Sequence, residues 1–224
     1  MDEKSVFFDS STIISMALSC ALPLLKNLKE NFGGKFYITE SVYGETIERA
    51  LQSLRFKYEG YRIKELLANG ILEIFQEKEI KFEINKYMDS LNRTYFIYNK
   101  PLNIFQKGEI STIIACANYE GSSLAIDERI ARMLVEDINS LTNWLEQKFH
   151  AKVSVNKKAQ KNWLDFSENL PYCIRSAELA VEAWREGFLQ NLDQLYGLLW
   201  ALKFSGCAIT EQEINTYIKL LKKR

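Results

Sequence analysis

The sequence predicts an α/β protein built around a short parallel sheet that is covered by helices. Short apolar, β-prone runs alternate with longer segments whose apolar residues recur at helical spacing, in the order β-α-β-α-α-β-α-β-α. Strands joined through helical crossovers pair in parallel, and the helices then cover both faces of the sheet. The chain has 224 residues, of which 47% are hydrophobic, so it is long enough to bury one such core.

Each element follows from its local pattern. The predicted strands are short apolar runs that end at polar or turn-forming residues: 4–8, 36–38, 71–75, 123–126 and 172–174. The predicted helices carry apolar residues three and four positions apart: about 12–30, 43–54, 59–68, 108–117, 130–135, 141–149, 177–188, 192–204 and 211–221. Pro23 is expected to kink the first helix, Thr39 or Ser41 to cap the second, and Thr210 to cap the last.

Two segments interrupt the alternation of strands and helices. Residues 76–106 are charged and aromatic, with a periodicity closer to helix than to strand. Residues 138–171 hold a weak helix, a Lys-containing stretch and a second helical piece around Trp163. We therefore predict one elaborated domain, with a core of about 1–137 and 172–224 and a helical insertion of about 138–171.

Charge and cysteine content exclude several classes of protein. Lys and Arg number 29, as do Asp and Glu, which excludes a uniformly basic nucleic-acid coat but not a local basic patch. The four cysteines are far apart and form no CxxC pair, which argues against a zinc ribbon or a disulfide framework and favours a reducing compartment. The single histidine, His150, excludes a His-rich metal site.

The apolar run at residues 12–25 resembles the core of a signal peptide. It is shorter than a span requires, and the segment before it carries Asp2, Glu3 and Asp9 instead of a basic start. The sequence therefore predicts a cytoplasmic protein with no membrane partner.

Four carboxylates are expected near one rim of the sheet. Asp9 directly follows VFF and Asp127 directly follows LAI, at the carboxyl ends of two strands, while Glu45 and Glu109 lie near helix starts. Clustered carboxylates repel unless a cation joins them, and oxygen-only clusters suit Mg²⁺ or Mn²⁺. The alternative is local, because Asp after a strand commonly caps a helix and Glu in a first turn complements the helix dipole.

The direction of Glu45 is a separate question. It precedes Ile47 by two residues, which places it about 200° around the helix from the apolar face. Glu40 and Glu48 are the alternatives at this position, and an irregular first turn would also bring Glu45 to the rim.

The segments VFFDSSTII, YITESVYGETI, KGEISTIIACA and LAIDERIAR resemble the motifs of the PIN-domain nucleases, in the family's order over most of residues 4–136. The resemblance implies a three-layer α/β/α fold with a short parallel sheet, plus extra helices near the C-terminus. The residues that match the family's catalytic acidic positions are Asp9, Glu45, Glu109 and Asp127. Of these, the resemblance implies Asp9, Glu109 and Asp127 as metal ligands.

Further positions of the chain also resemble the family. Ser11 matches a small polar residue that hydrogen-bonds near the site, and Arg132 matches a basic position with a structural role. IRSAELAVEAWREGFL and LLWALKFSGCAITEQEI resemble the family's last strand with its helix and a closing helical pair. Where the family has a Gly-rich turn, this chain has Arg175 and Ser176, which are expected to cover the site or to contact a phosphate.

The resemblance implies a Mg²⁺- or Mn²⁺-dependent endoribonuclease whose products carry 5′-phosphate and 3′-hydroxyl ends. It raises the hypothesis of a toxin from a toxin–antitoxin pair, with RNA as substrate and an antitoxin protein or a second copy of the chain as partners. The alternative is a catalytically weak or inactive module that binds RNA or protein. A receiver-like domain fits less well, since Asp9 has no acidic neighbour.

Two regions, one rich in lysine and one rich in aromatic residues, each fit two alternative roles. The lysines of residues 147–164, beside Trp163, could grip an RNA backbone and stack a base, or could form a solvated face over a core tryptophan. The aromatic residues of 95–105 could line a groove or a dimer interface, or could pack under a long connection.

Overall fold

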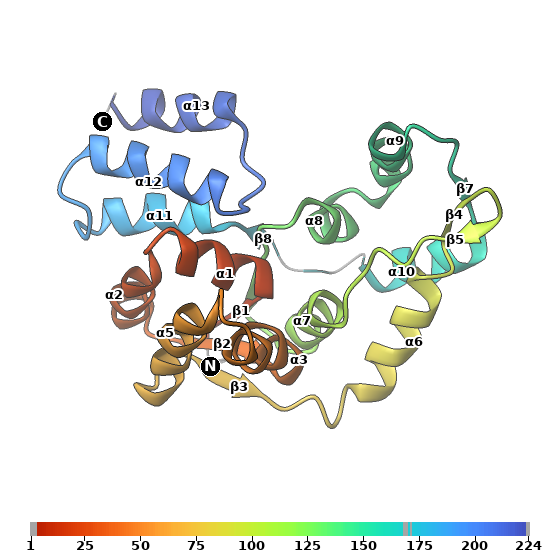
Figure 1. The fold of residues 1–224 in the computed structure, drawn as a ribbon, viewed down its shortest axis with the longest axis horizontal. Coiled ribbons are helices and arrows are strands. Elements are labelled where there is room, and N and C mark those ends of the chain that lie inside the picture. The colour runs from red at the N-terminus through yellow and green to blue at the C-terminus, as the bar shows by residue number, and fades with distance from the viewer. Residues whose placement is uncertain (1–3, 168–169, 171, 223–224) are drawn as a thin grey trace.

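A computed structural model of the protein describes residues 4–167, 170 and 172–222. At its centre is a five-stranded, fully parallel sheet in the order β3-β2-β1-β6-β8, with helices on both faces (Figure 1). The strands are β1 Ser5–Phe8, β2 Lys35–Thr39, β3 Glu73–Phe75, β6 Ser122–Ala125 and β8 Cys173–Ile174. The predicted three-layer α/β/α class with additional C-terminal helices is confirmed, and all five predicted strands are present.

The central strand β1 separates two hydrophobic cores. Val6 and Phe8 belong to the core on one side of the sheet, and Phe7 belongs to the core on the other. Successive side chains of a strand point to opposite faces, so a run of buried apolar residues fits a strand that is covered on both sides. The first core lies among six main helices: α1 Ser10–Leu18, α2 Leu22–Phe32, α5 Lys57–Ala68, α11 Ser176–Arg185, α12 Leu192–Phe204 and α13 Glu211–Leu221.

The predicted single helix over residues 12–30 is wrong, because the chain breaks between α1 and α2. Cys20 adopts a left-handed conformation with φ of 60°, which an α-helix cannot continue through. Pro23 lies in the first turn of α2, where its missing N–H costs nothing, and does not kink a continuous helix.

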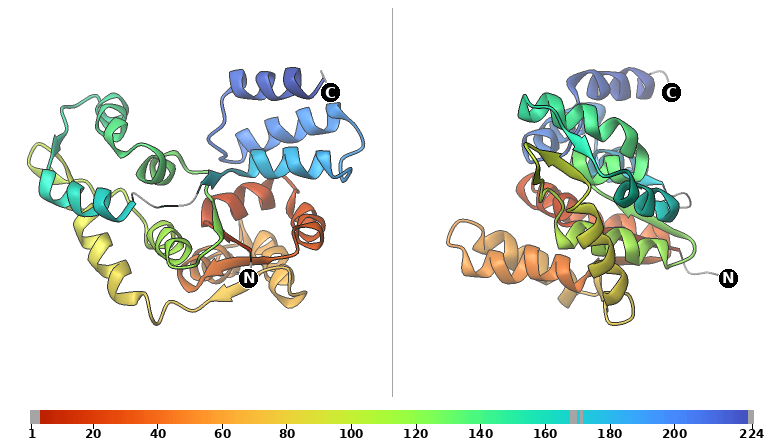
Figure 2. Two further views of the ribbon diagram at one scale, coloured as in Figure 1. Left: turned by 180° about the vertical axis from the view of Figure 1, so that it is seen from behind. Right: turned by 90° about the vertical axis from the view of Figure 1, so that its right-hand side faces the viewer.

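The second core lies under α7 Lys107–Ala117, which runs across the opposite face of the sheet, and extends to α8 Arg129–Glu136. Beyond it, an arm is formed by residues 81–101 and 138–167, to one side of the main sheet (Figures 1 and 2). The arm contains α6 Lys81–Leu91, α9 Ile138–Phe149, α10 Lys157–Ser167 and a small antiparallel sheet of β4 Tyr95–Ile97, β5 Lys100–Pro101 and β7 Ser154–Val155.

The predicted insertion at 138–171 is therefore only part of this arm; its residues 168, 169 and 171 lie outside the described residues. Tyr95 pairs with Val155, so the insertion shares a sheet with the segment before α7. The helical periodicity of 76–106 is right for α6 and wrong for the hairpin of β4 and β5. Trp163 is fully buried and donates to the carbonyl of Leu134 at 2.8 Å, which makes it a core residue and not a base-stacking one.

The chain after β2 forms an irregular helical segment. It passes through α3 Glu40–Tyr43, a π-helical turn η1 Gly44–Glu48, and α4 Arg49–Gln52. Thr39 caps its start by accepting from the amide of Val42, as one of the two sequence alternatives predicted. Across the described part of the chain, no helix combines the length and the apolar character that a membrane crossing requires.

Candidate acidic active site

Asp9 lies at the carboxyl end of β1, where it caps α1. Its Oδ2 accepts hydrogen bonds from the amide and the hydroxyl of Ser11, at 3.0 and 2.6 Å. The side chain is almost completely buried, and its Oδ1 has no hydrogen-bond partner among the described residues. A buried carboxylate oxygen is costly unless a donor, a proton or a cation joins it. The capping interpretation is thus correct for one oxygen of Asp9 and leaves the other unexplained.

Glu45 reaches the same rim because the helix that carries it is irregular there. The π-helical turn Gly44–Glu48 is wider than an α-helical turn, and the expectation of an irregular turn is confirmed. Ser10 Oγ donates to Glu45 Oε2, and the amide of Gly108 donates to Glu45 Oε1 at 3.2 Å. A Cβ on Gly108 would clash with Glu45 Oε2, so glycine at this position allows Glu45 to approach the start of α7.

The two alternative acids do not take the place of Glu45. Glu40 Oε2 accepts from the amide of Glu77 at 3.0 Å and so supports the loop after β3. Glu48 is exposed.

Glu109 lies in the first turn of α7 and is 7% exposed. Its Oε2 accepts from the amide of Gln106 at 3.0 Å, in a capping box, so the local interpretation holds here as well. Burial raises the pKa of Glu109 to about 9, and the charges of Asp9, Glu128 and Glu45 add to that rise. In the absence of a cation, Glu109 therefore keeps its proton at neutral pH.

Burial also raises the pKa of Asp9 to about 6, against the effect of its hydrogen bonds from Ser11, and the charge of Glu45 adds to it. The charges of Asp9 and Glu45 thus act on Glu109, and the charge of Glu45 acts on Asp9, so these three predicted acids lie within electrostatic range of one another.

Asp127 follows β6 as predicted, and its carboxylate accepts hydrogen bonds at the start of α11. It is fully buried, and its two oxygens accept from the amide and the hydroxyl of Ser176 at 2.7 and 2.5 Å. The hydroxyl of Thr12 lies 3.4 Å from its Oδ1. Burial raises the pKa of Asp127, while the hydrogen bonds from Ser176 oppose that rise. Asp127 thus satisfies the donors at the start of α11, while its convergence with Asp9 and its role as a metal ligand stay predictions.

The charge of Glu128, the residue after Asp127, contributes to the raised pKa of Glu109. Glu128 was not among the site residues predicted from the sequence. It is partly buried, and its Oε2 accepts from the amide of Ala131 at the start of α8. Ser11 Oγ accepts from the amides of Asp127 and Glu128 at 3.0 and 3.2 Å, which links this loop to Asp9. Neighbouring residues after a strand point in different directions, so the Asp-Glu pair in LAIDERIAR was the signal that either acid could face the site.

The residues expected to support the site are Ser11, Arg175 and Ser176, and they differ in what they contact. Ser11 is confirmed as a hydrogen-bonding residue beside Asp9. Arg175 is wrong as a phosphate contact, because its buried guanidinium pairs with Glu178 at 2.7 Å and with Glu213 at 2.8 Å. Ser176 is committed to Asp127 and is fully buried, so it does not cover the acidic rim.

The donor chemistry of this rim fits a hard divalent cation. Its ligands would be carboxylate oxygens, which suit Mg²⁺ or Mn²⁺, and the unpartnered Oδ1 of Asp9 is one such oxygen. Among the described residues, no group of three or more His, Cys, Asp or Glu side chains is arranged as a metal site. Binding a cation at Asp9 therefore requires a neighbouring carboxylate to turn toward it.

Comparison of the chain with protein-family models, with curated proteins and with solved structures gave no match. The similarity to PIN-domain nucleases thus stays a prediction from the four sequence motifs.

Proposed function

We propose that the protein is a Mg²⁺- or Mn²⁺-dependent endoribonuclease. The observation that carries the proposal is the buried, unpartnered Oδ1 of Asp9, among the charges of Glu45 and Glu109. As a helix cap, Asp9 uses only its Oδ2. A cation bound to Oδ1 would compensate the negative charge of this buried carboxylate and of the acids near it. The resemblance of the four motifs supports RNA as the substrate.

Each side chain has a distinct task in this proposal. Asp9, Glu109 and Glu128 would hold the cation, and Ser11 fixes Asp9 through Oδ2. Glu45, held by hydrogen bonds at both oxygens, would orient the attacking water. When bound, the cation supplies an activated water and neutralises charge on the phosphodiester.

The test is cleavage of a fluorescently labelled single-stranded RNA by the purified protein in Mn²⁺. EDTA is expected to abolish cleavage, and Asp9→Asn to slow it by on the order of a hundredfold or more. Asp193→Asn, an exposed acid in the first turn of α12, is the matched control and should cleave like the unmodified protein. RNA that is bound but never cut, with binding unaffected by Asp9→Asn, would overturn the nuclease proposal.

One observation favours the alternative, a binding module without catalysis. The carboxylates of Glu45 and Asp127 already have hydrogen-bond donors at both oxygens, as acids with a purely structural role would. The hypotheses of a toxin role, an antitoxin partner, a homodimer and a cytoplasmic location rest on the sequence alone.

A further inference from the structure

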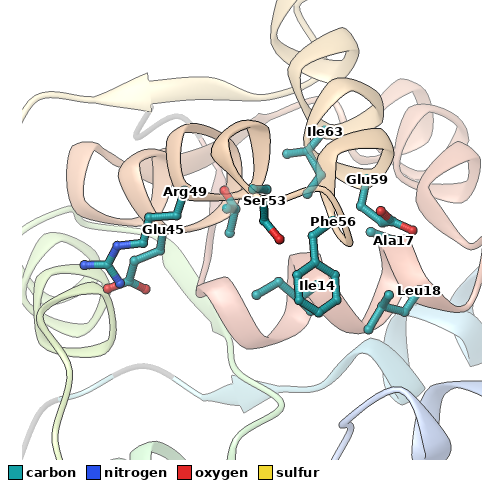
Figure 3. Close-up of a pocket in the computed structure, with 11 residues that line it drawn as sticks. Ile14, Ala17, Leu18, Glu45, Arg49, Ser53, Phe56, Glu59 and Ile63 are labelled. Carbon is teal, nitrogen blue, oxygen red and sulfur yellow. The ribbon is translucent and has the colours of Figure 1, made fainter.

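A mostly apolar pocket of about 280 Å³ lies between α1, α4 and α5 (Figure 3). Ile14 and Leu18 line it from α1, and Phe56 and Ile63 line it from the side of α5. Ile14, Leu18 and Phe56 are all partly exposed to solvent, so the pocket is open. An open apolar hollow of this kind marks a place where another molecule docks.

The turn beside this pocket carries a leucine that extends into solvent. Leu54 lies in the turn between α4 and α5, and its neighbours Ser53 and Phe56 both line the pocket. The side chain of Leu54 is 96% exposed. One exposed leucine is ordinary, but this one lies next to an open apolar hollow. The same face of the chain therefore carries a projecting apolar side chain and a pocket suited to receive one.

The charges of the turn and of the pocket are opposite in sign. Among the charged residues that line the pocket, the acids Glu45 and Glu59 outnumber the single base, Arg49. The turn and the start of α5 carry Arg55 and Lys57, and both side chains are exposed. Charge complementarity of this kind attracts and orients two surfaces. The turn of one copy therefore fits the pocket of another in polarity and in charge.

The two features together favour a second copy of the chain as the occupant. Because turn and pocket lie side by side on one face, a two-fold axis between two copies lets each turn enter the pocket of the other. A partner of another sequence would fill the pocket but would leave Leu54 uncovered.

We propose that two copies of the chain associate through this face, with Leu54 of each copy in the pocket of the other. Arg55 and Lys57 of each copy then approach the acids of the facing pocket. Since Glu45 lies at one end of the pocket, the second copy lies beside the acidic site (Figure 3). The association does not depend on whether that site cleaves RNA.

Sedimentation velocity of the purified protein over a range of concentrations tests the association. The unmodified protein should be dimeric at concentrations on the order of 10–100 μM. Leu54→Asp brings a negative charge to an acidic pocket, and Leu18→Lys brings a positive charge to the pocket that receives Arg55. Each variant should weaken dimerisation at least about tenfold. Because Leu54 is 96% exposed, Leu54→Asp should leave the melting temperature of the monomer unchanged.

Mixing the two variants tests whether turn and pocket meet. A mixed pair has one intact contact, between the turn of the Leu18→Lys chain and the pocket of the Leu54→Asp chain. In its other contact the introduced charges attract each other. The mixture should therefore form heterodimers at a concentration at which each variant alone is monomeric.

Leu220→Asp is the matched control, since Leu220 is an exposed leucine of α13, and this variant should dimerise like the unmodified protein. An unmodified protein that stays monomeric up to about 100 μM would overturn the inference and leave the face to a partner of another sequence. A dimer that Leu54→Asp leaves intact would also overturn it, as would two variants that do not combine on mixing. No RNA or metal is present in these measurements, so the result is independent of the proposed cleavage.

Discussion

At the scale of single residues, Asp9 and Glu109 each combine two roles in one carboxylate. One oxygen of each accepts from a backbone amide at a helix start, at 3.0 Å in both cases. The negative charges also lie near one another, and burial raises both pKa values. Asn caps a helix as well as Asp does, so Asp9→Asn removes the charge while keeping the cap.

This arrangement predicts a stability that falls as the pH rises when no metal is present. The ordinary pKa values are 3.8 for Asp and 4.5 for Glu, and in the folded protein those of Asp9 and Glu109 are raised to about 6 and about 9. Between those limits the folded state binds more protons than the unfolded state, so the free energy of unfolding decreases with pH. The loss from about pH 5 to pH 9 should be on the order of a few kcal/mol.

Thermal unfolding in EDTA at several pH values measures this loss. Asp9→Asn and Glu109→Gln should each flatten the dependence. The pKa values of Glu178 and Glu213, beside Arg175, are lowered, so these groups affect stability only at more acidic pH. A melting temperature that increases with pH between about pH 5 and pH 9 would refute the prediction.

At the scale of elements, the sequence predicted what depends on local pattern. The strands follow from apolar runs, and the caps at Asp9, Thr39 and Thr210 follow from the residue types at helix starts. The π-helical turn around Glu45 is joined to segments far apart in the chain, through Ser10 and Gly108. The break at Cys20 is closed by local hydrogen bonds at a residue type that rarely adopts a positive φ, so its residue types did not predict it. The direction of an acid after a strand also depends on its surroundings: Asp127 accepts from Ser176, 49 residues away, whereas Glu128 accepts from the nearby amide of Ala131.

The roles of Asp127 and Glu128 can be separated by substitution. Asp127→Asn should lower the free energy of unfolding by about 1–3 kcal/mol, because an amide nitrogen would face the donors of Ser176. It should leave the rise in melting temperature caused by Mn²⁺ intact. Glu128→Gln should do the reverse and reduce the effect of Mn²⁺ on a protein of nearly unchanged stability. If Asp127→Asn folds normally and loses the response to Mn²⁺, Asp127 is the ligand that the sequence motif predicts.

At the scale of the whole molecule, the main sheet separates two hydrophobic cores, and the arm extends from the second core (Figure 1). Sequence periodicity predicted the helices of the arm. It could not predict that residues 95–101 join the insertion, because the pairing of β4 with β7 links segments about sixty residues apart.

The arm carries exposed lysines on α10, which predicts a role in binding but not in chemistry. Replacing both Lys157 and Lys158 with Ala should weaken RNA binding and lower the slope of its salt dependence by about 0.7 for each RNA phosphate that is no longer neutralised. The single-turnover cleavage rate at saturating protein should not change. Lys219→Ala, on the exposed side of α13, is the control. Equal affinity and equal salt slope in the double variant would assign these lysines to a solvated face.

The hydrogen bonds between Asp127 and Ser176 have a consequence for synthesis on the ribosome. They join residues 49 positions apart, so Asp127 emerges well before the donors that satisfy it. Burying that charge without them is unfavourable, and a nascent chain that ends before α11 should keep the end of β6 hydrated. Ser11 binds the same loop through the amides of Asp127 and Glu128. The loop beside the acidic rim therefore reaches its final form only after Ser176 has been translated and has left the ribosome.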